Sequence, residues 1–518
     1  MRLARLLRRL DRPEGSGAAS NSRSHQPEGS GAASNSRSHS QCFGKLSENV
    51  DISSLACDSR SVTKDSLFIA IDGTKVKGSD FIAEAIRNGA SCVVAAHRRT
   101  ALFERRVPVI YFPDTRYALA VMADEFFGHP SRKLKVIGVT GTNGKTSITY
   151  LIRSILQEAN FSCGIIGTIN YSFKEKIIPA QNTTPGPLEL QMFLKQMVRA
   201  GCAYCIMEVS SHSLDQQRTA GIDFKAALFT NLTHDHLDYH LNLENYFSAK
   251  AKLFRGLNKD AFSIINADSP YAGRLATIGL GKLITYGIDS ECDIRAENLA
   301  LDLAGSEFIL HTKKRKPSSG GKTKIKTRLI GRHNISNLLA AIAFALSQKI
   351  ELAQIVRAVE NFNGVKGRLE RVRAQERNIF IDYAHTPDAL ANVLGTLKAL
   401  SKGKLTVVFG AGGERDALKR PLMGKLAEKY ADKIIITSDN PRSEEPQKIA
   451  DDITLKMRGD NYKVILDRKE AIACALSASY AGDTVLIAGK GHENYQILKD
   501  RKIEFDDMAV VKQLLQQT

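Results

Sequence analysis

Short apolar runs alternate with amphipathic segments along most of this chain. Runs such as "KVIGVT" (135–140), "YCIMEV" (204–209) and "TVLIAG" (484–489) are almost wholly apolar, as expected for strands covered on both faces of a parallel sheet. Segment 146–158 instead places apolar side chains three and four residues apart, at Ile148, Leu151, Ile152, Ile155 and Leu156. This spacing gives a helix one apolar face to pack on a sheet. The pattern predicts an α/β protein with mostly parallel sheets.

The same alternation divides the chain after residue 41 into three blocks. Residues 42–132 mix short strands and helices, and we predict a small α/β N-terminal domain there. Residues 133–363 predict a central domain with a mostly parallel sheet, and residues 364–518 a doubly wound, Rossmann-like C-terminal domain. A length of 518 residues agrees with several domains, because single cores seldom grow that large.

The first 41 residues do not follow this pattern. The sequence "PEGSGAASNSRSH" occurs at 13–25 and again at 27–39. Segments so poor in apolar residues cannot bury a core, so we interpret residues 1–41 as a disordered tail ahead of the folded protein. The leading "MRLARLLRRL" is rich in arginine, as transit peptides are, but the acidic residues that follow argue against that interpretation.

Composition and charge narrow the class of protein. The chain is 43% hydrophobic and 25% charged, and no apolar run approaches the roughly 20 residues that span a membrane. The net charge of +18 would suit nucleic acid or a polyanionic small molecule, but no nucleic-acid-binding motif accompanies it. Much of the excess lies in the basic segment 313–328, which we interpret as an exposed hairpin tip. The eight cysteines have no disulfide spacing, which favours reduced thiols and a cytoplasmic location.

The sequence "GVTGTNGKTS" (138–147) joins a predicted strand to a predicted helix. Two glycines let the backbone N–H groups turn toward phosphate oxygens at a helix N-terminus. A lysine then supplies positive charge, and the next hydroxyl is placed for Mg²⁺. The loop is one residue longer than a strict Walker A motif, yet it still predicts a P-loop-type ATPase domain. We expect ATP contacts from Gly141, Thr142, Asn143, Gly144, Lys145, Thr146 and Ser147.

This loop and eight further motifs resemble the Mur ligase family over residues 42–518. The motifs are "NTTPGP" (182–187), "EVSSHSLDQQR" (208–218), "NLTHDHLDYH" (231–240), "YFSAK" (246–250), "DYAHTPD" (382–388), "GGERD" (412–416), "DNPRSEEP" (439–446) and "GKGHE" (489–493). Within the family they are most similar to the branch that adds meso-2,6-diaminopimelate to UDP-N-acetylmuramoyl-L-alanyl-D-glutamate in peptidoglycan precursor synthesis. The resemblance implies an ATP-dependent amide ligase that works through an acyl phosphate.

The resemblance also implies which residues carry the chemistry. The catalytic set is Lys145, Glu208, His236 and Lys250. Thr146, Glu208 and His236 would bind Mg²⁺. Lys250 would join them after reaction with CO₂, as a carbamate (N6-carboxylysine), because a neutral lysine amine is a nucleophile. Asn334 would lie near the adenine.

Two groups of residues match the family's contacts to the UDP-linked substrate. In the first domain these are Cys57, Ser59, Thr74, Lys75 and Val76. In the central domain they are Asn182, Thr183, Thr184, Ser210, Gln216 and Arg218. Hydroxyls, amides and a guanidinium suit a sugar–peptide that carries carboxylates.

The loop "SDNPRSEEP" (438–446) follows a predicted strand and bears the incoming amino acid in the family. There Asp439 and Asn440 would engage its ammonium and carboxylate groups, Pro441 would set the exit of the loop, and Arg442 would bind the distal carboxylate of diaminopimelate. By resemblance, the pocket is completed by Arg415, Gly489 and Glu493, with Glu493 suited to the distal ammonium.

Three alternatives remain open at this point. The first is the L-lysine-adding ligase of the same family, whose substrate lacks the distal carboxylate. The second is folylpolyglutamate synthase, which shares the phosphate loop but not the pairing of "DNPR" with "GKGHE". The third is a non-catalytic scaffold homologue. For the favoured function we expect small-molecule partners only, no nucleic acid, no membrane insertion and a monomer.

Overall fold

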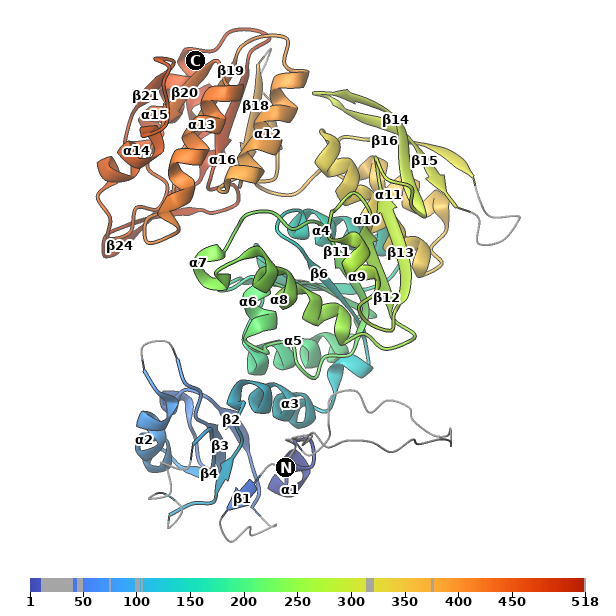
Figure 1. Cartoon of the computed structure of the whole chain (residues 1–518), viewed down its shortest axis with the longest axis vertical. Helices are drawn as coiled ribbons and strands as arrows, with labels where there is room; N and C mark the ends of the chain where they lie inside the picture. Colours follow the sequence, from blue (N-terminus) through green and yellow to red (C-terminus); the bar gives the residue numbers. More distant parts are fainter. Residues whose placement is uncertain are drawn as a thin grey trace, which may run out of the picture.

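The computed structural model describes residues 1–10, 41–43, 50–73, 76–97, 103, 106–313, 321–373 and 377–516. The protein is a row of three α/β bodies, with the first domain at the bottom of Figure 1, the central domain in the middle and the third at the top. Each has its own sheet, and most strands of each sheet are parallel. The predicted fold class is therefore confirmed.

The first domain is a five-stranded sheet in the order β1-β5-β4-β3-β2. Its strands are β1 (Gln41–Phe43), β2 (Ser54–Ala56), β3 (Ser66–Ile69), β4 (Ala90–Ala95) and β5 (Val109–Tyr111). Its helices are α1 (Leu3–Leu7), α2 (Ile82–Arg87) and α3 (Thr115–Phe127). All strand pairs are parallel except β1 with β5, and α3 leads from the sheet toward the central domain.

Residues 1–10 belong to the first domain. Leu3 and Leu6 of α1 are fully buried in the same cluster as Met122 of α3, and the N-terminal ammonium donates to the carbonyl of Ile52 at 2.8 Å. The prediction of a disordered tail is therefore wrong for residues 1–10, because their leucines, spaced as on a helix, cover an apolar face of α3. Residues 11–40 lie outside the described residues.

The central domain is built on an eleven-stranded sheet in the order β16-β15-β14-β13-β12-β11-β6-β10-β7-β8-β9. Its strands are β6 (Lys135–Thr140), β7 (Cys163–Ile166), β8 (Asn170–Phe173), β9 (Lys176–Pro179), β10 (Tyr204–Glu208), β11 (Phe224–Phe229), β12 (Phe262–Asn266), β13 (Lys282–Gly287), β14 (Ile294–Asp302), β15 (Gly305–Thr312) and β16 (Lys322–Thr327). The middle of the sheet is parallel, and antiparallel strands extend both edges.

Helices cover both faces of this sheet, and the sheet separates two apolar cores. They are α4 (Lys145–Glu158), α5 (Pro187–Arg199), α6 (Ser211–Asp215), α7 (Leu237–His240), α8 (Leu243–Arg255), α9 (Ala272–Ala276), α10 (Arg332–Ser347) and α11 (Leu352–Asn361). The α4 stripe predicted from the sequence is buried as expected. The predicted basic hairpin is partly described: β15 and β16 pair antiparallel, and residues 314–320 lie outside the description.

The third domain has a six-stranded sheet in the order β17-β18-β22-β19-β20-β21 and a separate β23–β24 hairpin. The strands are β17 (Glu370–Arg373), β18 (Asn378–Asp382), β19 (Leu405–Phe409), β20 (Lys433–Ile436), β21 (Tyr462–Val464), β22 (Thr484–Ala488), β23 (Tyr495–Leu498) and β24 (Arg501–Glu504). The helices are α12 (Pro387–Leu400), α13 (Arg420–Tyr430), α14 (Pro446–Thr454), α15 (Arg468–Ser477) and α16 (Asp507–Gln516).

The carboxyl ends of strands from the central and third domains face each other. At this junction Nδ2 of Asn143, in the loop after β6, donates to Oδ2 of Asp388 at the start of α12 over 2.6 Å. Oγ1 of Thr233, after β11, donates to the same oxygen at 3.2 Å. Ligands of open α/β sheets bind at such strand ends, so the junction is where a site is expected.

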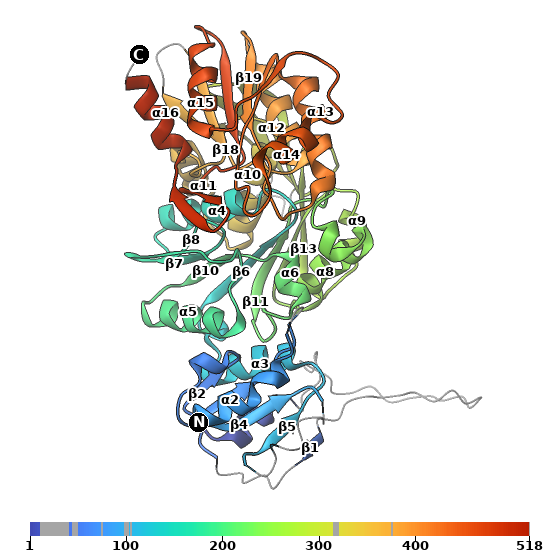
Figure 2. The same cartoon turned by 90° about the vertical axis from the view of Figure 1, so that its left-hand side faces the viewer.

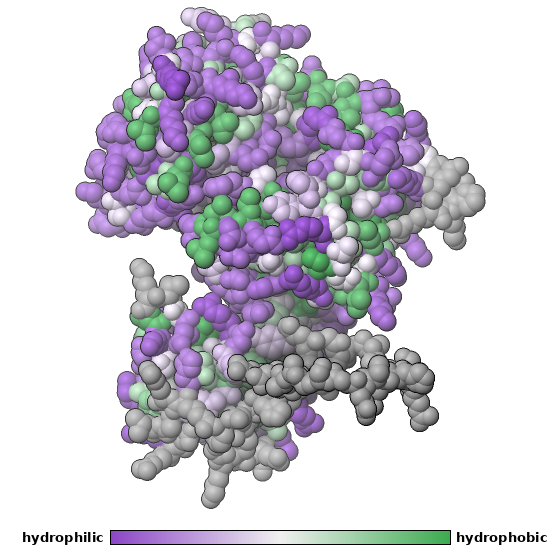
Figure 3. Space-filling view, viewed as in Figure 1, coloured by the Kyte–Doolittle hydropathy of each residue, from purple (hydrophilic) through white to green (hydrophobic). Residues whose placement is uncertain are grey.

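Across the described part of the chain, no helix is long and apolar enough to cross a membrane. On the face that Figure 3 shows, hydrophilic side chains predominate and apolar ones are scattered among them.

The packing of α1 predicts that the first residues stabilise the first domain. Replacing Leu3 and Leu6 by alanine together should destabilise it by about 2 kcal/mol or more, since each change leaves a cavity in a buried cluster. Thermal unfolding followed by circular dichroism would measure the loss, with the exposed Arg8→Ala as control. If the double variant unfolds at the same temperature as the Arg8→Ala control, the assignment of α1 to the domain is contradicted.

Candidate active site

The loop from Gly141 to Ser147 joins β6 to α4, and two glycines fix its path. Gly141 and Gly144 have φ angles of 142° and 88°, in the region that side chains disfavour. A Cβ on Gly141 would lie 1.8 Å from Oγ1 of Thr230, and one on Gly144 would lie 2.4 Å from Oδ1 of Asn337. The neighbouring strand and helix therefore approach the loop so closely that only glycine fits at both positions.

Lys145 lies across this loop. Its Nζ donates to the carbonyls of Gly141 at 2.9 Å and Thr142 at 2.8 Å. Burial lowers its pKa, and the carboxylates of Glu208 and Asp235 oppose that shift. The lysine's charge is thus held against the backbone that would receive a phosphate.

Glu208 ends β10 and is the centre of a buried group of hydroxyls. It is 1% exposed and accepts hydrogen bonds from Oγ1 of Thr146 at 3.0 Å and from Oγ1 of Thr168 at 2.9 Å. The backbone N–H of Thr168 donates to its other oxygen at 2.8 Å. The carboxylate therefore accepts a hydrogen bond from the hydroxyl of the phosphate loop, so the two residues expected to bind Mg²⁺ lie side by side.

Lys250 of α8 is buried, although a lone helical lysine is usually exposed. It is 1% exposed, its Nζ donates to the carbonyl of Gly141 at 2.8 Å and lies 4.4 Å from the ring centre of Tyr246. Burial, and secondarily the charge of Lys145, lowers the pKa of Lys250 well below its ordinary value. Among the described residues no carboxylate forms an ion pair with it, so the neutral form of the amine is favoured.

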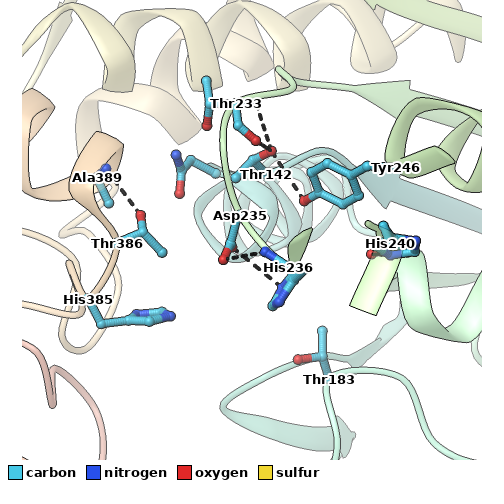
Figure 4. A network of polar contacts seen from close by, with 12 residues as sticks. Thr142, Thr183, Thr233, Asp235, His236, His240, Tyr246, His385, Thr386 and Ala389 are labelled. Atoms are coloured by element: carbon cyan, nitrogen blue, oxygen red, sulfur yellow. Dashed lines mark hydrogen bonds and ion pairs between the residues drawn. The ribbon is translucent and has the colours of Figure 1, made fainter. Parts of the chain in front are cut away.

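Asp235 and His236 lie between the central and third domains. Figure 4 shows them between Tyr246 on one side and His385 of the third domain on the other. Nε2 of His236 lies 3.4 Å from Oδ2 of Asp235. Burial raises the pKa of Asp235, but electrostatic interactions with His236, His385, Lys419 and Lys145 outweigh it and hold the pKa below its ordinary value. An ionised carboxylate and an imidazole thus stand beside the phosphate loop.

The residues predicted to contact the muramoyl-dipeptide form one group at the carboxyl end of β10. The contacts between them are Thr184 Oγ1 to the Glu208 carbonyl at 2.8 Å, Ser210 N to Thr184 Oγ1 at 3.1 Å, Arg218 Nη1 to the Thr184 carbonyl at 2.9 Å, and Arg218 Nε to Gln216 Oε1 at 3.0 Å. Oγ1 of Thr183 lies 3.1 Å from Oγ1 of Thr168, and Asn182 N–H donates to the Tyr171 hydroxyl at 3.2 Å. The structure therefore brings this set next to Glu208.

The predicted uridine residues lie apart from these, in the first domain. Cys57 is exposed, Val76 is 55% exposed, and the hydroxyl of Ser59 is turned inward to Oε2 of Glu84 at 2.7 Å. Thr74 and Lys75 lie outside the described residues. A cavity of about 350 Å³ opens in the first domain, at the ends of β3 and β4. It is lined by Ala70, Asp72, Lys77, Ser79, Ala95, Ala96 and His97, so the uridine contacts predicted at Cys57 and Ser59 lie outside its lining.

The loop Asp439–Arg442 follows β20 in the third domain, and Arg442 has a φ of 55°. Its guanidinium donates to the carbonyl of Gly413 at 2.6 Å, and its backbone N–H donates to that of Ile497 on β23 at 3.1 Å. Within the described ranges no carboxylate pairs with this guanidinium. Arg442 is therefore a partly buried charge that the carbonyls of Gly413 and Ile497 hold in place, and the described residues supply no counter-ion for it.

Glu493 follows β22, and one oxygen of its carboxylate is held in place by hydrogen bonds. Its Oε2 accepts from Nδ2 of Asn440 at 2.9 Å and from Nζ of the fully buried Lys490 at 3.4 Å. Asp439 is 8% exposed, and its Oδ2 would lie 2.6 Å from a Cβ on Gly489, whose φ is 111°. Gly489 therefore lets the two strand ends meet. Arg415, in contrast, is exposed on the loop after β19.

The structure adds residues that the sequence did not single out. Asn334 bonds to Asn337, and it is Asn337 whose amide oxygen lies against Gly144. Arg368, just before β17, donates from Nη2 to Oγ1 of Thr146 at 3.2 Å. The second asparagine of "HNISN" and the arginine of "GRLE" were available as signals, but their partners are distant in sequence.

The site combines a phosphate loop, a buried carboxylate and a buried lysine beside it, and residues of the third domain that contact the loop. These features define the class of protein. Three family models match this chain: the Mur ligase family catalytic domain at 51–127, the Mur ligase middle domain at 139–345 and the Mur ligase glutamate ligase domain at 367–491. The chain belongs to the Mur ligase family, whose members are ATP-dependent, amide-forming ligases.

The names of individual relatives are more specific than those of the family models. The chain is 48% identical to the UDP-N-acetylmuramoyl-L-alanyl-D-glutamate–2,6-diaminopimelate ligase of Aquifex aeolicus, over 90% of this chain and 94% of the relative. It is 44% identical to the enzyme of that name from Geobacillus thermodenitrificans, over 90% of this chain and 95% of the relative. A solved structure of a ligase of the same name matches with a TM-score of 0.65 at 34% identity, over 90% of this chain and 95% of that one.

The close approach at Gly141 predicts a strict requirement for glycine in nucleotide binding. Gly141→Ala should weaken ATP binding at least about tenfold, or about 1.4 kcal/mol, because the loop must shift away from Thr230. Isothermal titration calorimetry with ATP and Mg²⁺ would measure it. The control is Gly201→Ala, which also has a positive φ, 74°, but has open space around its Cα. Equal affinity in both variants would argue against the steric role.

Proposed function

We propose that this chain adds meso-2,6-diaminopimelate to the γ-carboxylate of the D-glutamyl residue of UDP-N-acetylmuramoyl-L-alanyl-D-glutamate, at the expense of ATP. The observation that carries the proposal is the arrangement at the end of the third sheet. Arg442 presents a guanidinium with no carboxylate partner among the described residues, while Asp439 and Glu493 lie nearby as carboxylates. An amino acid with an ammonium and a carboxylate at its far end fits that distribution of charge.

The chemistry proceeds in two steps. The γ-carboxylate oxygen attacks the γ-phosphorus of ATP, and the bond from this phosphorus to the β-phosphate oxygen breaks. ADP departs, and an acyl phosphate is formed. The amino group of diaminopimelate, after losing a proton, attacks the acyl carbon, and inorganic phosphate departs from the tetrahedral intermediate. Both steps bring anions together, so positioning and charge neutralisation account for most of the catalysis.

The chain's own residues supply that neutralisation. The glycines of the phosphate loop expose backbone N–H groups at the start of α4. Lys145 adds a positive charge, and its ammonium group can turn from the carbonyls of its own loop toward a bound phosphate. Arg368 brings a second cation from the third domain to Thr146. Because this arginine comes from another domain, the arrangement depends on the third domain resting on the central one, which also excludes water from the acyl phosphate.

Mg²⁺ fits the donors present. Thr146 and Glu208 offer oxygen atoms 3.0 Å apart, and His236 lies on the loop after β11. The buried amine of Lys250, which has no carboxylate partner among the described residues, becomes an oxygen ligand if CO₂ converts it to a carbamate. When bound, the metal neutralises charge on the phosphate and on the attacking carboxylate. Oxygen ligands of this kind are those that Mg²⁺ prefers.

The UDP end of the substrate is assigned to the first domain. The cavity at the ends of β3 and β4 lies beside Val76 and carries both a cation, Lys77, and a carboxylate, Asp72. The dipeptide would then reach toward Arg218 and Glu208. With substrates of this kind we infer a monomer that works in the cytoplasm, where ATP and the nucleotide-linked precursors are made.

The L-lysine-adding reaction is the closest alternative. Lysine provides the distal ammonium for Glu493 but leaves Arg442 with no anion, so a buried charge would remain uncompensated. A scaffold role does not need the buried lysine or the exact fit at Gly141, and the positions for phosphate, metal and amino acid all carry chemically suitable residues.

Replacing Arg442 tests the choice of amino acid. Arg442→Ala should lower kcat/KM for meso-diaminopimelate by on the order of 100-fold, the loss expected when one partner of a partly buried charge pair is removed. KM for ATP should change little. Phosphate release measured with each amino acid would report both, with the exposed Arg458→Ala as control. Wild-type release with L-lysine but none with diaminopimelate would overturn the proposal.

Replacing Lys250 tests the carbamate. Lys250→Ala should abolish phosphate release, and added formate or acetate should restore part of it by supplying the missing oxygen ligand. Lys252→Ala, two residues further along α8, where Nζ of Lys252 donates to Oδ1 of Asp215 at 3.1 Å, should remain active. In the wild type, ¹³CO₂ should give a carbamate carbon signal that Lys250→Ala lacks. If neither the rescue nor the signal is observed, the carbamate on Lys250 is contradicted.

A further inference from the structure

Tyr383 follows β18 in the motif "DYAHTPD" and contacts the amino-acid pocket through its hydroxyl. The hydroxyl donates to Oε1 of Glu493 at 3.4 Å. The other oxygen, Oε2, is the one that Asn440 and Lys490 hold. Among the described contacts, Tyr383 is therefore what orients the second oxygen of this carboxylate.

The ring of Tyr383 faces the other half of the site. The guanidinium carbon of Arg368 lies 4.5 Å from the ring centre, a cation–π contact. The same guanidinium donates to Oγ1 of Thr146 in the phosphate loop at 3.2 Å. Nε of Arg368 is buried and has no hydrogen-bond partner in the described part of the chain. The ring therefore packs against a cation that touches the phosphate loop.

The surroundings allow Tyr383 little freedom. The rings of His385 and His492 lie 4.6 Å and 4.9 Å from it. A Cβ on Gly491, whose φ is 52°, would lie 2.7 Å from Cβ of Tyr383. The backbone of the "GKGHE" loop therefore presses directly against the tyrosine, and the carboxyl ends of the neighbouring parallel strands β18 and β22 fix both together.

We propose that Tyr383 is a positioning residue shared by the two halves of the site, orienting Glu493 for the distal ammonium of the amino acid and Arg368 for the phosphates. The proposal rests on the proposed ligase function. It does not depend on the choice between diaminopimelate and lysine, because both carry a distal ammonium. One side chain then makes amino-acid recognition and the phosphate-loop arginine depend on the same strand end.

Two substitutions separate the two contacts. Tyr383→Phe removes the hydroxyl and keeps the ring, so KM for the amino acid should rise roughly three- to tenfold while kcat and KM for ATP stay unchanged. Tyr383→Leu removes both, so KM for ATP should also rise and kcat should fall. Tyr383→Met, which fills the space with a flexible side chain, should behave like Tyr383→Leu and replaces it if that variant does not fold.

Phosphate release gives these constants, and Tyr480→Phe and Tyr480→Leu, at a residue 73% exposed in the same domain, are the controls. Unchanged KM for the amino acid in Tyr383→Phe, or unchanged KM for ATP in both Tyr383→Leu and Tyr383→Met, would overturn the proposal. A merely structural tyrosine would instead raise both KM values together and lower the unfolding temperature of Tyr383→Phe.

Failure of the ligase function gives a different result. If the wild type releases no phosphate with any amino acid, calorimetry with ATP and thermal protection by diaminopimelate or lysine replace the two KM values. Loss of amino-acid protection in Tyr383→Phe with intact ATP affinity would still support the shared position. Protection equal to that of the wild type would overturn it.

Discussion

Positive charge buried where the domains meet is the constraint on which the site depends. Lys145 and Arg368 both converge on the phosphate loop, and burial lowers the pKa of Lys145. Glu208 and Asp235 offset only part of this charge. A protein holds cations in such surroundings at a cost in stability, and that cost is recovered when anions bind. The site is therefore preorganised for a nucleotide phosphate and a carboxylate, the two groups that an acyl phosphate brings together.

The topology explains why these groups converge. Parallel strands bring their carboxyl ends to one edge, and the loops after β6, β10 and β11 carry the phosphate loop, Glu208 and Asp235. The third sheet does the same with the loops after β18, β20 and β22. The two edges face each other, and the hydrogen bond from Asn143 to Asp388 links them. In the proposed function, this brings the nucleotide and the amino acid together. In the function that we propose, the first domain holds the UDP end of the substrate, and the other two domains carry the chemistry.

The pocket that we propose for the amino acid depends on backbone geometry as well as on charge. Arg442 adopts a positive φ, and Gly413 and Ile497 hold its guanidinium and backbone N–H. Gly489 permits Asp439 to approach because it has no Cβ. An arginine oriented by carbonyls keeps its charge uncompensated, which favours a ligand with a carboxylate at the matching position.

The sequence by itself determined the α/β class and the phosphate loop, because strand periodicity and glycine spacing are local, while Glu208, Lys250 and Arg442 were singled out through the resemblance of short motifs to the family. Only the tertiary structure decided that Lys250 is buried, that Asn337 and Arg368 reach the phosphate loop, and that Tyr383 joins two half-sites, since those contacts link segments far apart in the chain. It also placed residues 1–10 in the first domain, where α3 completes a core that ten residues cannot form alone.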